Sequence, residues 1–170
     1  MLLGQTFSKL VLALKEDCHD VLLPPEEGCE SASQPVISIS IVRNTRGYIE
    51  RIAHQINGCY ENGWYDACAV MVRRLLEILI IETFEHFGLA DKVKNTHGDF
   101  LYLADLIAKL LSETTWGLSR NTKTALPKLK DIGDKSAHSR RLNAVRSDID
   151  RVLPELRVTY QELIYLARLK

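Results

Sequence analysis

The stretch LKDIGDKSAHSRR, from Leu129 to Arg141, combines the side chains that a metal-free phosphodiesterase uses. His138 follows Asp134 by four residues and stands among the cations Lys130, Lys135, Arg140 and Arg141. A histidine can exchange protons with a 2′-hydroxyl or a leaving oxygen, while Lys or Arg stabilises the charged transition state. His138 and Asp134 are therefore the candidate catalytic residues. In the alternative interpretation, Asp134 caps a helical turn, His138 bonds to the backbone, and the two arginines face solvent.

Positive charge is concentrated around this stretch, although the whole chain has a formal net charge of zero. From Ser119 to Arg146 there are eight Lys and Arg against two Asp, whereas the residues before Val36 carry six Asp and Glu against two Lys. Such a window predicts a surface that binds the phosphates of RNA or DNA, and a solvated helix surface can have the same composition. The candidate nucleic-acid-binding residues are Lys128, Lys130, Lys135, Arg140, Arg141 and Arg146.

The cysteines and histidines show no metal-binding pattern. The four Cys form no CxxC pair, and the five His form no HxxxH or HExxH pattern. We expect free thiols, no metal and no cofactor. The hydrophobic first stretch lacks a positive n-region and a small-residue cleavage site, and Lys9 interrupts it. These features predict a cytoplasmic protein that does not associate with a membrane.

A long apolar segment, from Tyr65 to Phe87, predicts the central helix. It contains no Pro or Gly, and its apolar residues cover nearly the whole helical circumference. Its middle carries Arg73, Arg74 and Glu77, and the carboxylate of Glu77 lies four and three residues after the two arginines. This spacing predicts a buried or half-buried structural ion pair. The alternative is an arginine that faces a phosphate or a subunit partner.

Helical periodicity also predicts the elements around the central helix. We expect a helix over residues 44–60 that forms an antiparallel hairpin with the central helix, because Asn62 and Gly63 between them favour a turn. Further helices are predicted after Asp99, after a cap at Ser119 or Thr124, and from near Ser147 to the end. Gly133 and Asp134 should break or bend the second of these, and Pro127 fits only its first turn. Pro154 should kink or split the last helix. The prediction is an all-α bundle of four to five helices over residues 43–170.

Residues 1–42 are predicted to form an N-terminal appendage. Residues 2–16 have the spacing of an amphipathic helix, and Pro24 and Pro25 mark a linker. VISISIV, residues 36–42, alternates as a strand does, but no second strand is evident. It must therefore pair with another subunit, form an extended arm, or join the next helix. The unburied apolar residues predict a homodimer or higher oligomer, with the helix and VISISIV in its interface.

Two segments together resemble a known family. YENGWYDACAVMVRRLLEILI, followed about fifty residues later by LKDIGDKSAH, is similar to prokaryotic helical domains of unknown function found beside or fused to restriction and abortive-infection proteins. That family lies in or near the HEPN superfamily. The resemblance covers about residues 44–168. Its most specific pieces are RRLLE and the Gly-Asp-x-x-Ala-His block, where relatives show Gly-Asn before Ala-His. It implies an HEPN-like bundle that dimerises, with a role linked to nucleic acid or phage defence.

The same resemblance bears on catalysis. Catalytic HEPN members are dimeric, metal-independent ribonucleases with an Arg, a polar residue and then a His. The resemblance places the His at His138, the polar residue at Asp134, and Gly133 where the Arg should stand. It therefore implies a non-catalytic, dimer-forming module that binds nucleic acid or a partner protein of a defence system. The alternatives are a metal-independent ribonuclease that uses His138, and an oligomerising regulatory or structural subunit.

Overall fold

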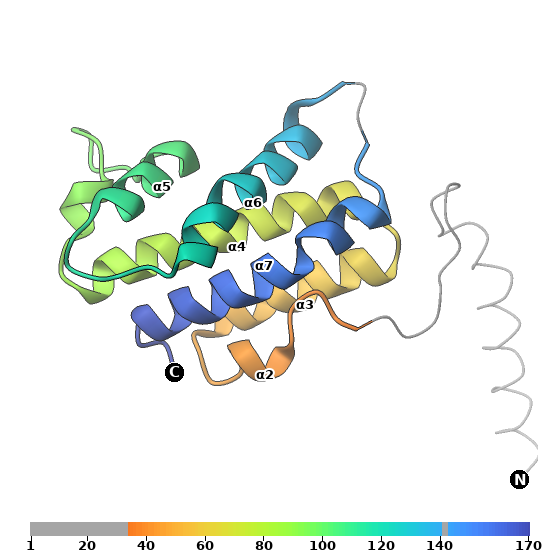
Figure 1. The fold of residues 1–170 in the computed structure, drawn as a ribbon, viewed down its shortest axis with the longest axis horizontal. Helices are drawn as coiled ribbons and strands as arrows, with labels where there is room; N and C mark the ends of the chain where they lie inside the picture. Colours follow the sequence, from red (N-terminus) through yellow and green to blue (C-terminus); the bar gives the residue numbers. More distant parts are fainter. Residues whose placement is uncertain (1–33, 141–142) are drawn as a thin grey trace, which may run out of the picture.

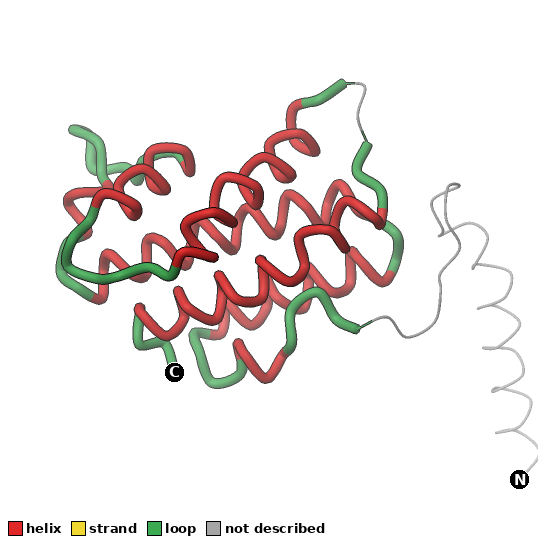
Figure 2. Tube along the Cα trace, viewed as in Figure 1, coloured by secondary structure: helices red, strands yellow, loops and turns green. Residues whose placement is uncertain are grey.

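The structure is a computed structural model that describes residues 34–140 and 143–170 (Figure 1). Figure 2 shows helices joined by loops, with no strand in the described part of the chain, and this confirms the all-α class. The predicted helix over residues 2–16, the linker after it and Arg141 lie outside the described residues. The elements are α2 (Ile39–Val42), α3 (Gly47–Glu61), α4 (Tyr65–His86), the 3-10 helix η1 (Ala90–Val93), α5 (Leu103–Ser112), α6 (Arg120–His138) and α7 (Arg146–Leu166).

The predicted hairpin between α3 and α4 is confirmed. Gly63 has a φ of 73°, a left-handed conformation that glycine adopts without steric cost. The backbone N–H of Trp64 then donates to the carbonyl of Cys59 at 2.8 Å. The chain therefore reverses within three residues, and the apolar stripe of α3 packs directly on α4.

Helix α4 is the centre of the bundle, as its apolar circumference predicts. Helices α3, α6 and α7 pack around it, and α6 lies obliquely across it (Figure 1). From α7, the hydroxyl of Tyr160 donates to the backbone carbonyl of Val72. At the far end of α4, Phe84 meets the ring of Trp116 edge to face, with 5.0 Å between centroids. A continuous buried core therefore surrounds α4 on most sides.

Helix α6 is longer than predicted. Ser119 is its N-cap and accepts a hydrogen bond from the N–H of Thr122 at 3.2 Å, which matches one of the two predicted caps. The predicted break at Gly133 and Asp134 is wrong, because the helix continues to His138. Gly133 is buried, and a Cβ at this position would lie 2.5 Å from the Cβ of Arg73. The glycine is therefore needed for the close approach of α6 to α4, and it does not end the helix.

Both prolines lie inside uninterrupted helices. Pro127 is not in the first turn of α6, and Pro154 does not split α7. Both are exposed, so the carbonyl groups four residues earlier, which lose their usual N–H partner, can bond to water. The start of α5 also differs from the prediction. It begins at Leu103 and not just after Asp99, because residues 93–101 form a turn in which the N–H of Leu101 donates to Val93 at 2.9 Å.

The predicted strand over residues 36–42 is wrong. Its last four residues form the single turn α2, and Val36, Ile37 and Val42 are buried in the core. The side chain of Asn57, in α3, receives the N–H of Ile37 and donates to its carbonyl, each at 2.9 Å. An asparagine thus satisfies the backbone groups that a neighbouring strand would otherwise pair.

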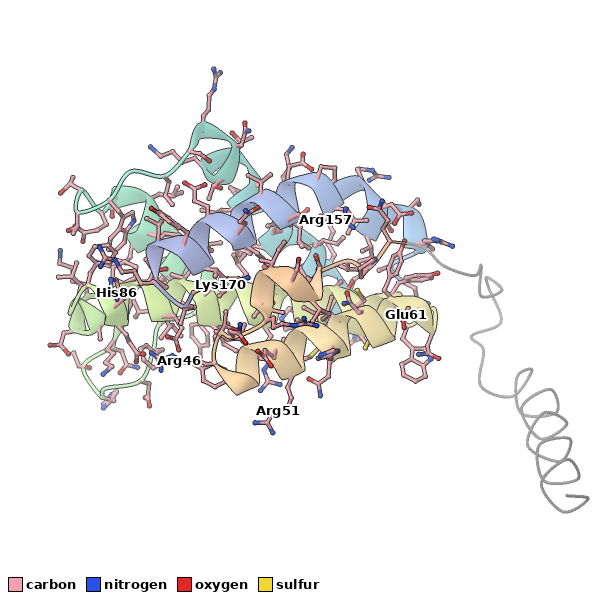
Figure 3. The ribbon with its side chains drawn as sticks, turned by 90° about the horizontal axis from the view of Figure 1, so that it is seen from below. Arg46, Arg51, Glu61, His86, Arg157 and Lys170 are labelled. Atoms are coloured by element: carbon pink, nitrogen blue, oxygen red, sulfur yellow. The ribbon has the colours of Figure 1, made fainter. Side chains whose placement is uncertain are left out.

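Two cations hold the same segment from the other side. Figure 3 shows α2 lying close to α7, with Arg157 and Lys170 labelled near it. The guanidinium of Arg157 donates to the carbonyls of Val36 and Pro35, and Lys170 donates to that of Ser40. The residues from 34 to 42 therefore pack on the bundle between α3 and the C-terminal half of α7.

Candidate functional site

The two candidate catalytic residues lie one turn apart near the end of α6. His138 is the last residue of the helix and is exposed, and Asp134 is half-buried. Asp134 accepts a hydrogen bond from Nε of Arg73 at 2.7 Å and another from Lys130. Its carboxylate therefore joins α6 to α4, and both of its oxygens are engaged. No hydrogen bond or ion pair of the His138 side chain is present within residues 34–140 and 143–170.

The environment of Asp134 keeps it charged. Burial raises the pKa of its carboxyl, but the hydrogen bonds and charges of Lys130 and Arg73 outweigh burial, so the pKa lies below its ordinary value. A carboxylate that stays ionised and is already bonded to two cations is a poor proton acceptor for a substrate. The position of Asp134 therefore supports a structural role better than a catalytic one.

The charged residues in the middle of α4 do not act alike. Arg73 is the half-buried member, and its Nη1 lies 3.8 Å from the carboxylate of Glu77, a longer contact than the one to Asp134. Arg74 is exposed and makes no ion pair or hydrogen bond with any described residue. The partner that compensates the half-buried Arg73 thus comes from another helix, sixty-one residues later in the sequence.

Most of the candidate nucleic-acid-binding residues are held in ion pairs. Lys128 contacts Glu155 at 3.3 Å, Lys135 contacts Asp131 at 2.7 Å, and Lys130 contacts Asp134. Arg140 is exposed, and Arg141 lies outside the described residues. Three lysines of α6 therefore contact carboxylates, whereas Arg120 and Lys123 of the same helix are exposed and make no ion pair with a described residue.

Arg146 occupies a different place from the other cations. Its guanidinium lies 5.5 Å from the ring centroid of Tyr60, and Nε donates to the Tyr60 hydroxyl at 3.2 Å. The Tyr60 hydroxyl in turn donates to Asp150, one turn after Arg146. These contacts join the start of α7 to the end of α3.

A cleft of about 460 Å³ opens between α6 and α7. Its apolar lining residues, which we call the floor, are Ile132, Ala144 and Val152. Its charged lining residues, which we call the rim, come three from each helix: Lys128, Asp131 and Lys135 of α6 and Asp148, Arg151 and Glu155 of α7. Of the candidate residues that the structure describes, only Lys128 and Lys135 line this cleft, whereas Asp134 lies on the side of α6 that packs on α4.

The rim of the cleft is balanced in charge. Each cation contacts a carboxylate, and the pair of Lys128 with Glu155 crosses from one helix to the other, while Arg151 lies 3.6 Å from Asp148. A backbone hydrogen bond and then Lys128 lower the pKa of Glu155, so this carboxyl is ionised at neutral pH. The cleft can therefore offer apolar contact together with charges of both signs, but no concentrated positive field.

Sequence reasoning missed the α7 side of this cleft. The spacing of Asp131 and Lys135, four residues apart, was sufficient to predict their pair. Nothing local indicates that Glu155 meets Lys128, because the two residues are far apart in the sequence. The one local signal for Asp148 was an acidic residue at a helix N-terminus. There its carboxylate accepts the backbone N–H of Val145 at 3.1 Å.

The structure gives no sign of a metal centre in the part of the chain that it describes. Within residues 34–140 and 143–170, no group of three or more His, Cys, Asp and Glu is placed to hold an ion. Cys59 and Cys68 are free thiols, and burial raises the pKa of Cys68 to about 12. Cys18 and Cys29 lie outside the described residues. Among the described helices, none combines the length and the apolar character needed to cross a membrane.

Comparison of the chain with protein-family models, with curated proteins and with solved structures finds no match.

Proposed function

We propose that the chain is a non-catalytic, dimer-forming HEPN-like module that binds a partner protein of a prokaryotic defence system through the cleft between α6 and α7. The observation that carries this proposal is the composition of the cleft. Its floor is apolar, and its six charged rim residues are paired with one another. A protein segment can bury an apolar side chain on the floor and exchange charged contacts with the rim.

The charge balance favours protein over nucleic acid. Nucleic-acid affinity comes mainly from cations that release counterions from phosphates. Lys128, Lys130 and Lys135 already contact carboxylates, so phosphates would have to compete with these pairs. A partner that carries both signs of charge meets no such competition, because it can contact the lysines and the carboxylates at once.

Binding to RNA or DNA is the second candidate, and one observation favours it. Arg120 and Arg140 are exposed, and neither makes an ion pair with a described residue. Two cations at opposite ends of α6 can contact a phosphate backbone without breaking a pair. A ribonuclease has less support, since His138 has no partner within the described residues and Asp134 is occupied by Arg73 and Lys130.

The cleft can be tested with a displayed library of random peptides selected on the immobilised protein. Val152 lies on the cleft floor, so Val152→Trp should fill the cleft and weaken the selected peptides at least about tenfold. Val158→Trp is the matched control, because Val158 lies on α7 and is 46% exposed. We expect selected peptides to combine an apolar residue with residues of both charges. These peptides should bind Val158→Trp as they bind the unaltered chain and should lose affinity for Val152→Trp.

Two results would contradict the proposal. One is a set of peptides that binds Val152→Trp as tightly as the unaltered chain. The other is a failed selection together with RNA or DNA binding that falls steeply as salt is added, which would favour the second candidate.

A further inference from the structure

Among the described residues, one side of α4 remains uncovered although the helix is at the centre of the bundle. Helix α6 covers α4 at Ala69 and Arg73, where Gly133 packs. Helix α7 covers it at Val72 through Tyr160. On the α3 side, the hydroxyl of Tyr48 donates to the buried Glu82. The residues that face the remaining side recur every three or four positions, are exposed or half-buried, and form what we call the α4 stripe: Ala67, Val70, Arg74, Glu77, Ile78 and Ile81.

The α4 stripe is apolar except for two opposite charges at its middle. Val70 is 36% exposed, an unusual position for a valine on the central helix of a bundle. Arg74 has no ion pair or hydrogen bond with the described residues. Among the described residues, Glu77 has only the 3.8 Å contact to Arg73, whose closer partner is Asp134. The two central charges thus lack a close partner in the described part of the chain.

The order of these residues makes the stripe complementary to itself. When two copies of a helix pack antiparallel about a two-fold axis, residues at equal distances before and after the axis face each other. With the axis between Leu75 and Leu76, Arg74 faces the partner's Glu77, and Val70 faces the partner's Ile81. Each of these two contacts is made twice, so both arginines meet carboxylates and both valines meet isoleucines.

We infer that the α4 stripe is the homodimer interface, occupied by the α4 stripe of a second copy in antiparallel orientation. Charge complementarity selects this occupant, since a parallel arrangement would set Arg74 against the partner's Arg74. The inference rests on the proposed dimer-forming module and locates its interface. This interface differs from the one predicted from the sequence, which uses residues 2–16 and 36–42, and Val36, Ile37 and Val42 are already buried within the chain.

Charge reversal tests both the surface and the orientation. The full chain, Arg74→Glu, Glu77→Arg and an equimolar mixture of the two variants are compared by analytical ultracentrifugation. The unaltered chain should be a dimer, and each variant should raise the dimer dissociation constant at least about tenfold, because each places like charges opposite one another twice. The mixture should dimerise again, since one variant then supplies two glutamates and the other two arginines. Arg120→Glu changes the net charge as Arg74→Glu does, but at an exposed residue away from the stripe, and this control should remain dimeric.

The outcomes separate this inference from the proposed function. An unaltered chain that stays monomeric at the highest soluble concentration overturns the homodimer itself. A dimeric chain that Arg74→Glu leaves unchanged overturns only the α4 interface. Variants that are monomeric alone and do not associate on mixing overturn the antiparallel orientation. Thermal melts of all four proteins show whether each variant is folded before its association is measured.

Discussion

At the scale of single residues, the half-buried Arg73 shows how one charge can organise a site. Its guanidinium contacts two carboxylates, but at different distances, 2.7 Å for Asp134 and 3.8 Å for Glu77. Asp134 also bonds Lys130. The side chain of Glu77 is 36% exposed, so water screens its contact with Arg73. Asp134 is therefore the residue that keeps Arg73 compensated between α4 and α6.

We predict that Asp134→Ala destabilises the chain much more than Glu77→Ala at neutral pH. Loss of Asp134 leaves Arg73 without its closest partner, at a cost of about 1 to 3 kcal/mol, while loss of Glu77 should cost less than about 1 kcal/mol. Because the folded-state pKa of Asp134 is lowered, its contribution is present above the unfolded value of about 4 and is lost as the pH falls through the lowered pKa. Urea unfolding at neutral and acid pH measures both effects, and equal costs for the two variants at neutral pH would disprove this role of Asp134.

At the scale of elements, two helical glycines have opposite surroundings. Gly133 of α6 is buried, and an added Cβ would meet Arg73 at 2.5 Å and the carbonyl oxygen of Ala69 at 3.1 Å. Gly58 lies inside α3, and nothing is within 4 Å of its added Cβ. Both positions gain helix propensity when glycine becomes alanine, so only the packing distinguishes them. The same geometry shows that a side chain as large as arginine does not fit at position 133 without moving α6 away from α4.

Gly133→Ala should therefore destabilise the chain, and Gly58→Ala should stabilise it. Overpacking at Gly133 costs about 1 to 3 kcal/mol, which outweighs a propensity gain of up to about 1 kcal/mol. At Gly58 the gain stands alone, so the melting temperature should rise. Chemical denaturation of the two variants side by side gives the comparison. A Gly133→Ala variant as stable as Gly58→Ala would show that α6 can move away from α4 at little cost.

At the scale of the whole molecule, charge is balanced both in total and locally. The chain has equal numbers of basic and acidic residues, and the described cations of its basic window mostly contact carboxylates. The stripe of α4 and the cleft between α6 and α7 also each carry both signs. Surfaces of this kind favour protein partners, including a second copy, over a polyanion.

We predict that the full chain leaves labelled RNA and DNA intact in EDTA, and that His138→Ala behaves as the unaltered chain does. A lone histidine supplies at most about 10⁴-fold acceleration, and no hydrogen bond or ion pair with a described residue orients its side chain. The logarithm of the nucleic-acid binding constant should fall with the logarithm of salt with a slope of about 1 to 3, as expected for few phosphate contacts. His97→Ala, at another exposed histidine, is the control. Cleavage in EDTA that His138→Ala abolishes and His97→Ala retains would establish a ribonuclease.

The sequence by itself determined the elements whose causes are local. The positions of α3 and α4 follow from the spacing of their apolar residues. The turn follows from Gly63, which lies two residues from the end of α3 and two from the start of α4. The all-α class follows from the same periodicity. Ser119 was likewise one of the two predicted caps of α6, because a cap involves only residues three positions apart.

Only the tertiary structure decided the features that depend on contacts between distant residues. The β-like pattern of residues 36–42 gives way to a buried segment because Asn57, twenty residues later, and Arg157 satisfy its backbone. Gly133 was predicted to break a helix, but it lies inside one. The position is a glycine because Arg73 of another helix leaves no room for a side chain. Among the lysines predicted to bind phosphate, Lys128 is paired because folding brings α7 beside α6, whereas Lys130 and Lys135 contact carboxylates one turn away on α6 itself. The sequence specifies which side chain stands at each position. Whether that side chain finds a charge partner, and how much space surrounds it, depends on neighbours that only folding brings together.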